Sequence, residues 1–178
     1  MVERAGRKKK MSFSTPEPGR GQTAAVVTVS DSRSRGEGTD LSGPAVAERL
    51  AGQGFQVVVQ SIVPDELPAI QSLLTDLAGK VRLIATTGGT GIAPRDVTPE
   101  ATLAVCERVI EGVAEQMRQA GLRKTRYAML SRGVCGVLGQ TLILNLPGSP
   151  QGAVDSLETV LDLVPHILDL LEGKTQHS

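Results

Sequence analysis

Short, mainly apolar runs alternate along the chain with segments whose apolar residues recur at helical spacing. The runs at 24–29, 81–86 and 141–146 have the composition of strands that are buried on both faces of a sheet. The segment 65–77 places four leucines and an isoleucine at the spacing of one helical face. Strands that alternate with helices predict an α/β layered fold with a largely parallel sheet.

Caps and turn residues divide the chain into ten predicted elements. Ser42, Asp65 and Thr98 stand where the N-caps of three helices are expected. Pro165 is expected to kink the last helix, because an interior proline removes a backbone hydrogen bond. The predicted strands are 24–29, 55–63, 81–86, 127–131 and 141–146, and the predicted helices are 44–51, 65–77, 98–110, 113–120 and 151–171.

A change in charge marks the start of the folded region. Residues 1–22 carry six Lys/Arg against two Glu, although the whole chain has a formal net charge of zero. This segment has too few apolar residues to offset its ordering entropy, and we expect a disordered basic tail. One domain then spans residues 23–173, and residues 174–178 form a short C-terminal tail.

Composition excludes several classes of function. A mildly acidic body, in a chain with only three aromatic residues, is unlike nucleic-acid modules, which stack bases on aromatic side chains. No run approaches the roughly 18 apolar residues of a membrane span. The chain has only two cysteines, and its basic N-terminus lacks the apolar stretch of a signal peptide. Both features favour a cytoplasmic protein with reduced thiols. We expect Cys106 in the core. Cys135 lies in the glycine-rich stretch 133–139, and the sequence leaves open whether it is buried or exposed to solvent.

Polar loops follow directly after four of the predicted strands. These loops are 30–31, 64–66, 88–96 and 145–149. Because the carboxyl ends of parallel strands share one edge of a sheet, we expect the loops to converge there and to form a ligand site.

The loop Gly88–Gly91, with the sequence Gly-Gly-Thr-Gly, is a candidate anion cradle. Successive backbone N–H groups in a glycine turn bind anions, and glycine lets a phosphate come close. The loop is not a Walker A motif, since no Lys-Ser/Thr pair follows. Pro94 stands where the dinucleotide fingerprint needs its last glycine. A plain tight turn is the alternative interpretation.

Arg95 and Asp96 follow the glycine loop. An arginine at that point suits bidentate contacts with phosphate oxygens. An aspartate beside a phosphate needs a cation between the two, which indicates Mg²⁺. A local Arg–Asp surface pair is the alternative. Asp65 has a similar ambiguity, as a second carboxylate, a helix cap or both.

Read together, these segments resemble the MoaB/Mog family of molybdenum cofactor biosynthesis. The resemblance covers roughly residues 24–172, and a seventeen-residue match around the glycine loop makes it specific. The segments that carry it are 28–33 (TVSDSR), 40–44 (DLSGP), 63–66 (VPDE), 86–102 (TTGGTGIAPRDVTPEAT), 129–133 (MLSRG) and 144–150 (LNLPGSP).

The resemblance implies a three-layer α/β/α sandwich that binds molybdopterin and usually assembles as trimers. The catalytic branch of the family adenylylates molybdopterin with ATP and Mg²⁺ and releases pyrophosphate. The motifs of that branch, PRDVTPEAT and PDE, are intact here. One departure is Gly121, where several relatives have serine. A non-catalytic molybdopterin-binding or scaffolding module is the alternative, and other cofactor-biosynthesis proteins are the implied partners.

The resemblance also implies the site residues. Asp65 and Asp96 are the expected catalytic pair and the expected Mg²⁺ ligands. Because two anions must approach each other, neutralising charge is the main catalytic task. An ionised phosphate needs no general base, so no histidine is required. The expected substrate-binding and nucleotide-binding residues are Ser30, Asp31, Gly88, Gly89, Thr90, Gly91, Arg95, Thr98, Pro99, Glu100, Ser131, Arg132, Asn145, Pro147, Gly148 and Ser149.

Overall fold

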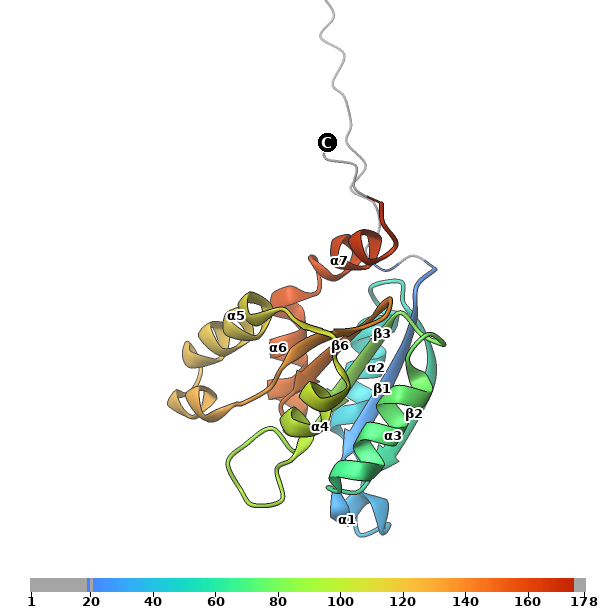
Figure 1. Ribbon diagram of the computed structural model, residues 1–178. Coiled ribbons are helices and arrows are strands. Elements are labelled where there is room, and N and C mark those ends of the chain that lie inside the picture. The colour runs from blue at the N-terminus through green and yellow to red at the C-terminus, as the bar shows by residue number, and fades with distance from the viewer. Residues whose placement is uncertain (1–18, 20, 175–178) are drawn as a thin grey trace, which may run out of the picture.

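The computed structural model describes residue 19 and residues 21–174, and Figure 1 shows their arrangement. A six-stranded sheet lies at the centre, in the order β2-β1-β3-β6-β5-β4. Its strands are β1 (Thr23–Val29), β2 (Gln56–Val63), β3 (Leu83–Thr87), β4 (Arg108–Val109), β5 (Cys135–Leu138) and β6 (Thr141–Leu146). The helices are α1 (Asp31–Ser34), α2 (Ser42–Ala51), α3 (Leu67–Leu77), α4 (Thr98–Val105), α5 (Glu111–Leu122), α6 (Pro150–Val160) and α7 (Val164–Leu171), with a 3₁₀ helix η1 (Arg126–Leu130).

The sheet is mostly parallel. Strands β2, β1, β3 and β6 pair in parallel, whereas β5 runs antiparallel to both of its neighbours. A hydrophobic core covers each face: α2, α5, α6 and α7 contribute to one core, and α3 and α4 contribute to the other. The predicted three-layer α/β/α sandwich is therefore confirmed.

Strand β1 shows why its sequence is continuously apolar. Ala24 and Val26 lie in the core beneath α2, whereas Ala25 and Val27 lie in the core beneath α3. A strand with helices on both faces has no solvent side, so both sets of alternating side chains must be apolar. The same burial holds for β3 and β6, which the sequence also predicted.

The predicted strand 127–131 is wrong, because these residues form the 3₁₀ helix η1. The Thr125 hydroxyl caps it by accepting from the Tyr127 N–H at 3.3 Å. Tyr127 and Met129 are both exposed, so the apolar character of the segment does not reflect a buried strand. The strand in this region is β5, which starts at Cys135 in the glycine-rich stretch. Cys135 is fully buried, so exposure of this thiol is excluded.

Two predicted helices end earlier than their patterns indicated. The helix from Thr98 stops at Val105, because the chain turns into β4 and pairs with β5. The predicted helix 151–171 is two helices, α6 and α7, rather than one kinked helix. Pro165 lies in the first turn of α7, where its missing N–H removes no helical hydrogen bond.

The predicted basic tail falls almost entirely outside the described residues. Of that segment, Gly19 is buried against the ring of Phe55. In the described part of the chain, no helix combines the length and the apolar character needed to cross a membrane.

Candidate functional site

The loops that follow β1, β2, β3 and β6 converge at one edge of the sheet, as the sequence predicted. The Ser30 N–H donates to the carbonyl of Val63 at 2.9 Å, which joins the ends of β1 and β2. The Gly88 N–H donates to the carbonyl of Leu146 at 3.1 Å, which joins the ends of β3 and β6. We call this rim the carboxyl edge.

The glycine loop 88–91 has a backbone that only glycine accommodates. Gly88 and Gly89 have φ angles of 93° and 64°, which side chains disfavour. A Cβ on Gly88 would collide with the carbonyl of Val29, and one on Gly89 would collide with the hydroxyl of Thr98. The loop is therefore pressed against the end of β1 and the start of α4.

Thr98 anchors this loop instead of capping α4. Its hydroxyl donates to the carbonyl of Gly88 at 2.9 Å, and its N–H donates to the carbonyl of Gly89 at 3.1 Å. The N-cap of α4 is Val97, which makes no side-chain cap bond. Pro99 is buried in the first turn of the same helix.

Asp31 and Asp65 bind each other's backbone. The Asp31 N–H donates to Asp65 Oδ2 at 2.8 Å, and the Asp65 N–H donates to Asp31 Oδ1 at 2.9 Å. Arg95 donates to Asp31 Oδ2 from Nε at 2.9 Å and from Nη2 at 2.7 Å. Asp31 therefore connects the β2 loop to the loop that follows the glycines. The expectation that Asp65 caps α3 is wrong, because Glu66 is the N-cap and makes no side-chain cap bond.

The two carboxylates have opposite pKa shifts. Burial raises the pKa of Asp65, and the negative charges of Asp31 and Asp96 add to this effect. Burial also acts on Asp31, but the hydrogen bonds from Arg95 and from the Asp65 N–H, together with the positive charges of Arg95 and Arg35, outweigh it and lower the pKa of that carboxyl. Of these two carboxylates, Asp65 therefore has the weaker charge compensation.

Asp96 borders the glycine loop from the other side. Its Oδ2 accepts from the Ala93 N–H at 2.8 Å. A Cβ on Gly91 would lie 2.8 Å from this oxygen, and a Cβ on Gly89 would lie 3.2 Å from Asp65 Oδ1. The structure thus brings both predicted metal ligands next to the loop. Within the described residues, no group of three or more His, Cys, Asp or Glu side chains is arranged to hold a metal ion.

Arg132 clamps the glycine loop from the segment before β5. Its Nε donates to the carbonyl of Gly91 at 2.8 Å, and its Nη2 donates to that of Asp96 at 2.7 Å. Its backbone N–H donates to the carbonyl of Thr90 at 2.8 Å, and its third guanidinium nitrogen pairs with Glu100. In this structure both predicted binding residues, Arg132 and Glu100, hold the protein's own loop.

Asn145 lies beneath the loop with its amide fully engaged. Its Oδ1 accepts from the Val134 N–H at 3.1 Å, and its Nδ2 donates to the hydroxyls of Thr86 and Thr102 at 3.0 and 2.9 Å. The side chain is 2% exposed, so it supports the floor of the site.

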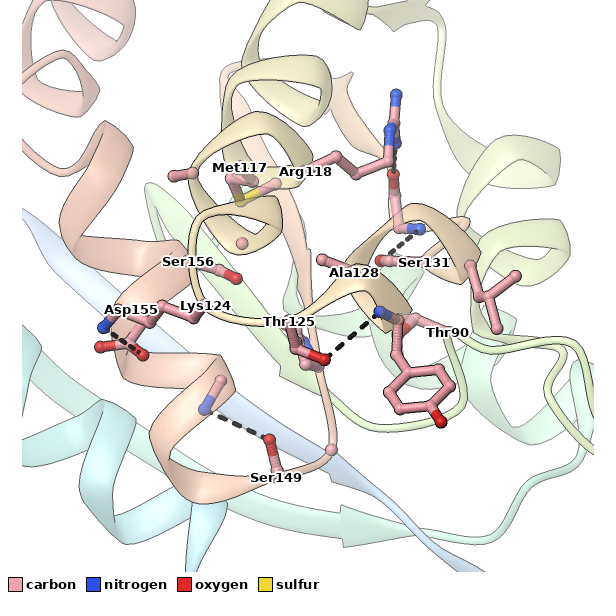
Figure 2. A pocket seen from close by; sticks show the side chains of 18 of the residues that line it. Thr90, Met117, Arg118, Lys124, Thr125, Ala128, Ser131, Ser149, Asp155 and Ser156 are labelled. Carbon is pink, nitrogen blue, oxygen red and sulfur yellow. Dashed lines mark hydrogen bonds and ion pairs between the residues drawn. The ribbon is translucent and has the colours of Figure 1, made fainter.

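A cavity of about 900 Å³ opens beside the glycine loop, and Figure 2 shows it from close by. Of the predicted residues, nine line it: Gly89, Thr90, Gly91, Asp96, Ser131, Asn145, Pro147, Gly148 and Ser149. Apart from Gly121, sequence reasoning missed the opposite wall, which α5, η1, the turn between them and α6 form with Met117, Arg118, Lys124, Thr125, Ala128, Asp155, Ser156 and others.

A smaller cavity of about 180 Å³ lies on the other side of Gly88 and is lined in part by Ser30 and Gly148. Its wall carries a polar network that the sequence did not reveal. The Thr28 hydroxyl donates to Asp40 Oδ2 at 2.6 Å, and the hydroxyls of Ser42 and Thr87 lie 3.0 Å apart. Ser42 is thus not the predicted side-chain cap of α2.

Comparisons with known proteins agree on one family. The model of a family described as "Probable molybdopterin binding domain" matches residues 25–166. The molybdopterin adenylyltransferase of Escherichia coli strain K12 is 41% identical over 165 residues, which cover 83% of this chain and 84% of that protein. The molybdopterin adenylyltransferase of Helicobacter pylori strain J99 is 39% identical and covers 83% and 86%.

Solved structures and longer relatives complete the comparison. The crystal structure of the molybdopterin biosynthesis enzyme MoaB from Thermus thermophilus is 52% identical, with a TM-score of 0.81 over 86% of this chain and 98% of that one. The chain spans only about a quarter of two longer relatives, the molybdenum cofactor synthesis protein cinnamon of Drosophila melanogaster, at 42% identity, and the gephyrin of Dictyostelium discoideum, at 39%.

Proposed function

The chain belongs to the MoaB/Mog family of molybdenum cofactor biosynthesis, and we propose that within this family it is a molybdopterin adenylyltransferase. In this reaction an oxygen of the terminal phosphate of molybdopterin bonds to the α-phosphorus of ATP. The bond from the α-phosphorus to the bridging oxygen breaks, and pyrophosphate leaves with its electron pair. The proposal is supported by relatives that carry this name over more than four-fifths of their length.

The observation that carries the proposal is the pair of carboxylates beside the glycine loop. Asp65 and Asp96 both border backbone that suits a phosphate. Two carboxylates next to phosphates repel them. Burial raises the pKa of Asp65, the nearby charges of Asp31 and Asp96 add to this, and neither Asp65 nor Asp96 has an ion-pair partner within the described residues. A bound cation would remove the conflict.

The residues present fit Mg²⁺. This ion takes oxygen ligands and is commonly held by one or two carboxylates together with substrate phosphates. Asp65 and Asp96 would hold it, and the bound ion would neutralise charge on the phosphates. Asp65 Oδ1 makes no hydrogen bond within the described residues, so this oxygen is available as a ligand.

The remaining residues position the reactants. The N–H groups of Gly89, Thr90 and Gly91 would donate to phosphate oxygens and lower the repulsion between the two anions, whereas the Gly88 N–H already donates to Leu146. Arg95, held by Asp31 in the free protein, lies within the same group of loops and supplies positive charge. Ser131 lines the cavity near the glycine loop, where its hydroxyl donates to the pterin or to its phosphate.

We further propose that the protein acts as a homotrimer in the cytoplasm. The exposed apolar side chains of Leu122, Tyr127, Met129 and Leu130 support an interface with another copy, since exposed apolar clusters are typical of such surfaces. Sedimentation equilibrium would test the trimer, and a monomeric mass at micromolar concentration would contradict it.

Pyrophosphate release tests the proposed reaction. The full chain is mixed with ATP, Mg²⁺ and molybdopterin, and pyrophosphate and adenylylated product are measured. We expect equal amounts of both, with release that depends on molybdopterin and on Mg²⁺. Molybdopterin binding without any adenylyl product would contradict the proposal and support a non-catalytic binding module.

A further inference from the structure

A second acidic group lies in the large cavity, away from the glycine loop. Asp155 is on α6, and its side chain is 19% exposed. Figure 2 shows Asp155 and Lys124 at one side of the pocket and Thr90 and Ser131 at the other. Nothing in the proposed phosphate chemistry requires a carboxylate at that far side.

Asp155 retains acceptor capacity in the free protein. Its Oδ2 pairs with Lys124 Nζ at 2.6 Å, and its Oδ1 accepts from Gln151 Nε2 at 2.8 Å. A carboxylate oxygen has two acceptor positions, so each oxygen can take one more hydrogen bond. The hydrogen bond from Lys124 lowers the pKa of Asp155, which keeps the carboxylate ionised at neutral pH.

The other two carboxylates that line the cavity are engaged elsewhere. Asp96 borders the glycine loop, and Glu158 pairs with Arg49 Nε at 2.7 Å. The wall beside Asp155 carries Met117, Ala128 and Ser156, which suits a flat ring with a few polar atoms. Asp155 is also paired, but its partners Lys124 and Gln151 themselves line the cavity, whereas Arg49 does not, so Asp155 is the carboxylate placed to recognise an edge with two donors.

A pterin ring presents such an edge. Its N3–H and its 2-amino group are parallel donors, and two parallel N–H groups match the two oxygens of a carboxylate. We propose that Asp155 is the residue that selects a 2-amino-4-oxopteridine in this cavity, an inference that rests on the proposed function. The ring then lies against α5 and α6, and its phosphate-bearing side points to the glycine loop.

Ring preference tests the proposal. Binding of two phosphate-free probes, 6-hydroxymethylpterin and lumazine, is measured on the full chain by their fluorescence. Lumazine carries an oxygen in place of the 2-amino group, so it turns an acceptor toward the carboxylate. We expect the wild-type protein to bind the pterin at least about tenfold more tightly, which corresponds to one good charged hydrogen bond.

The variant Asp155→Asn should remove this preference. An asparagine offers one acceptor and one donor group, which match N3–H and the 2-oxo group of lumazine. We expect pterin affinity to fall about tenfold while lumazine affinity holds or rises. Asp162→Asn is the matched control, because Asp162 is exposed just after α6 and does not line the cavity. The control should keep the wild-type preference.

Each outcome decides the assignment. An unchanged preference in folded Asp155→Asn overturns it, and so does a wild-type protein that binds both rings equally or binds neither. If Asp155→Asn does not fold, Asp155→Ser is measured in its place, since a single hydroxyl also cannot take the paired bonds. Pyrophosphate release by the wild-type protein is measured alongside, so failure of the ring assignment is separable from failure of the proposed reaction.

Discussion

Both ends of the sheet carry charged side chains, but acidic and basic groups are paired more completely at one end than at the other. At the amino edge, which lies beside α7 and opposite α1 in Figure 1, Arg82 donates to Gln140 and to the carbonyl of Leu168. Arg82 also pairs with Glu172 at 3.1 Å, and Lys174 pairs with the same carboxylate at 2.5 Å. Acids and bases at this edge are matched.

At the carboxyl edge the acids outnumber their partners. Arg95 pairs with Asp31, whereas no ion pair of the described residues includes Asp65 or Asp96. The pKa values follow this difference: the hydrogen bond from Lys174 lowers the pKa of Glu172, and burial raises that of Asp65. A fold keeps uncompensated charge where a ligand will supply the missing partner. The contrast between the edges therefore favours the carboxyl edge as the place of the proposed site.

The largest effect is expected for Asp96→Asn. The amide keeps an oxygen that can accept from the Ala93 N–H but loses the charge that would hold a cation. Turnover should fall by at least about two orders of magnitude, or roughly 2.7 kcal/mol of transition-state stabilisation. Molybdopterin affinity should change little. Pyrophosphate release and direct binding measure the two quantities, and normal turnover would contradict the metal assignment.

Asp65→Asn should also lower turnover about a hundredfold, yet without loss of stability. An aspartate whose pKa is raised by folding favours the folded state in its protonated form, so its charge costs stability above that pKa. The neutral amide removes this cost and keeps an acceptor for the Asp31 N–H. At pH 7.5 the thermal midpoint should equal or exceed that of the wild type, and the difference should vanish as pH falls through the raised pKa. A lower midpoint at pH 7.5 would indicate a purely structural role.

Arg132→Lys tests whether loop geometry matters at the carboxyl edge. Lysine keeps the charge but cannot donate at once to the carbonyls of Gly91 and Asp96 and to Glu100. We expect a loss of about 1 kcal/mol in unfolding free energy and a fall of roughly tenfold in turnover. Urea unfolding and pyrophosphate release are measured together. Glu100→Gln leaves the Arg132 guanidinium and its hydrogen bonds to the two carbonyls in place, so this variant should give the smaller loss of turnover.

The sequence predicted the central buried strands better than it predicted η1 and β5. Strands β1, β3 and β6 are apolar on both sides because helices cover both faces, a pattern that local composition reveals. The segment of η1 has similar apolar residues, but Tyr127 and Met129 are exposed. Strand β5 contains Gly136, where a Cβ would collide with Cys106. A glycine that permits close packing looks like a loop residue when only the sequence is known.

The convergence of the four polar loops was predicted correctly, because it follows from the direction of the strands. Polar residues directly after parallel strands must share one edge, so Asp31, Asp65 and the glycine loop were found together. Most of the far wall was missed because Lys124, just after α5, and Asp155, on α6, come together only through the packing of α5 against α6. Their spacing in the sequence carries no signal of a site. The roles of Ser42 and Thr98 were mistaken because a hydroxyl at the start of a helix is indistinguishable from a cap without tertiary contacts.

The smallest effect is expected for Glu172→Gln, the counterpart of Asp65→Asn at the amino edge. Turnover should stay normal, and the thermal midpoint at pH 7.5 should fall by up to about 3 °C. The sign is opposite to that at Asp65: Lys174 lowers the pKa of Glu172, so the carboxylate stabilises the fold above its unfolded pKa. This contribution disappears as pH falls through the lowered pKa, and the two midpoints should then converge. A midpoint at pH 7.5 that rises in both variants would show that the two edges do not differ in charge compensation, since removing either carboxylate would then relieve the same repulsion.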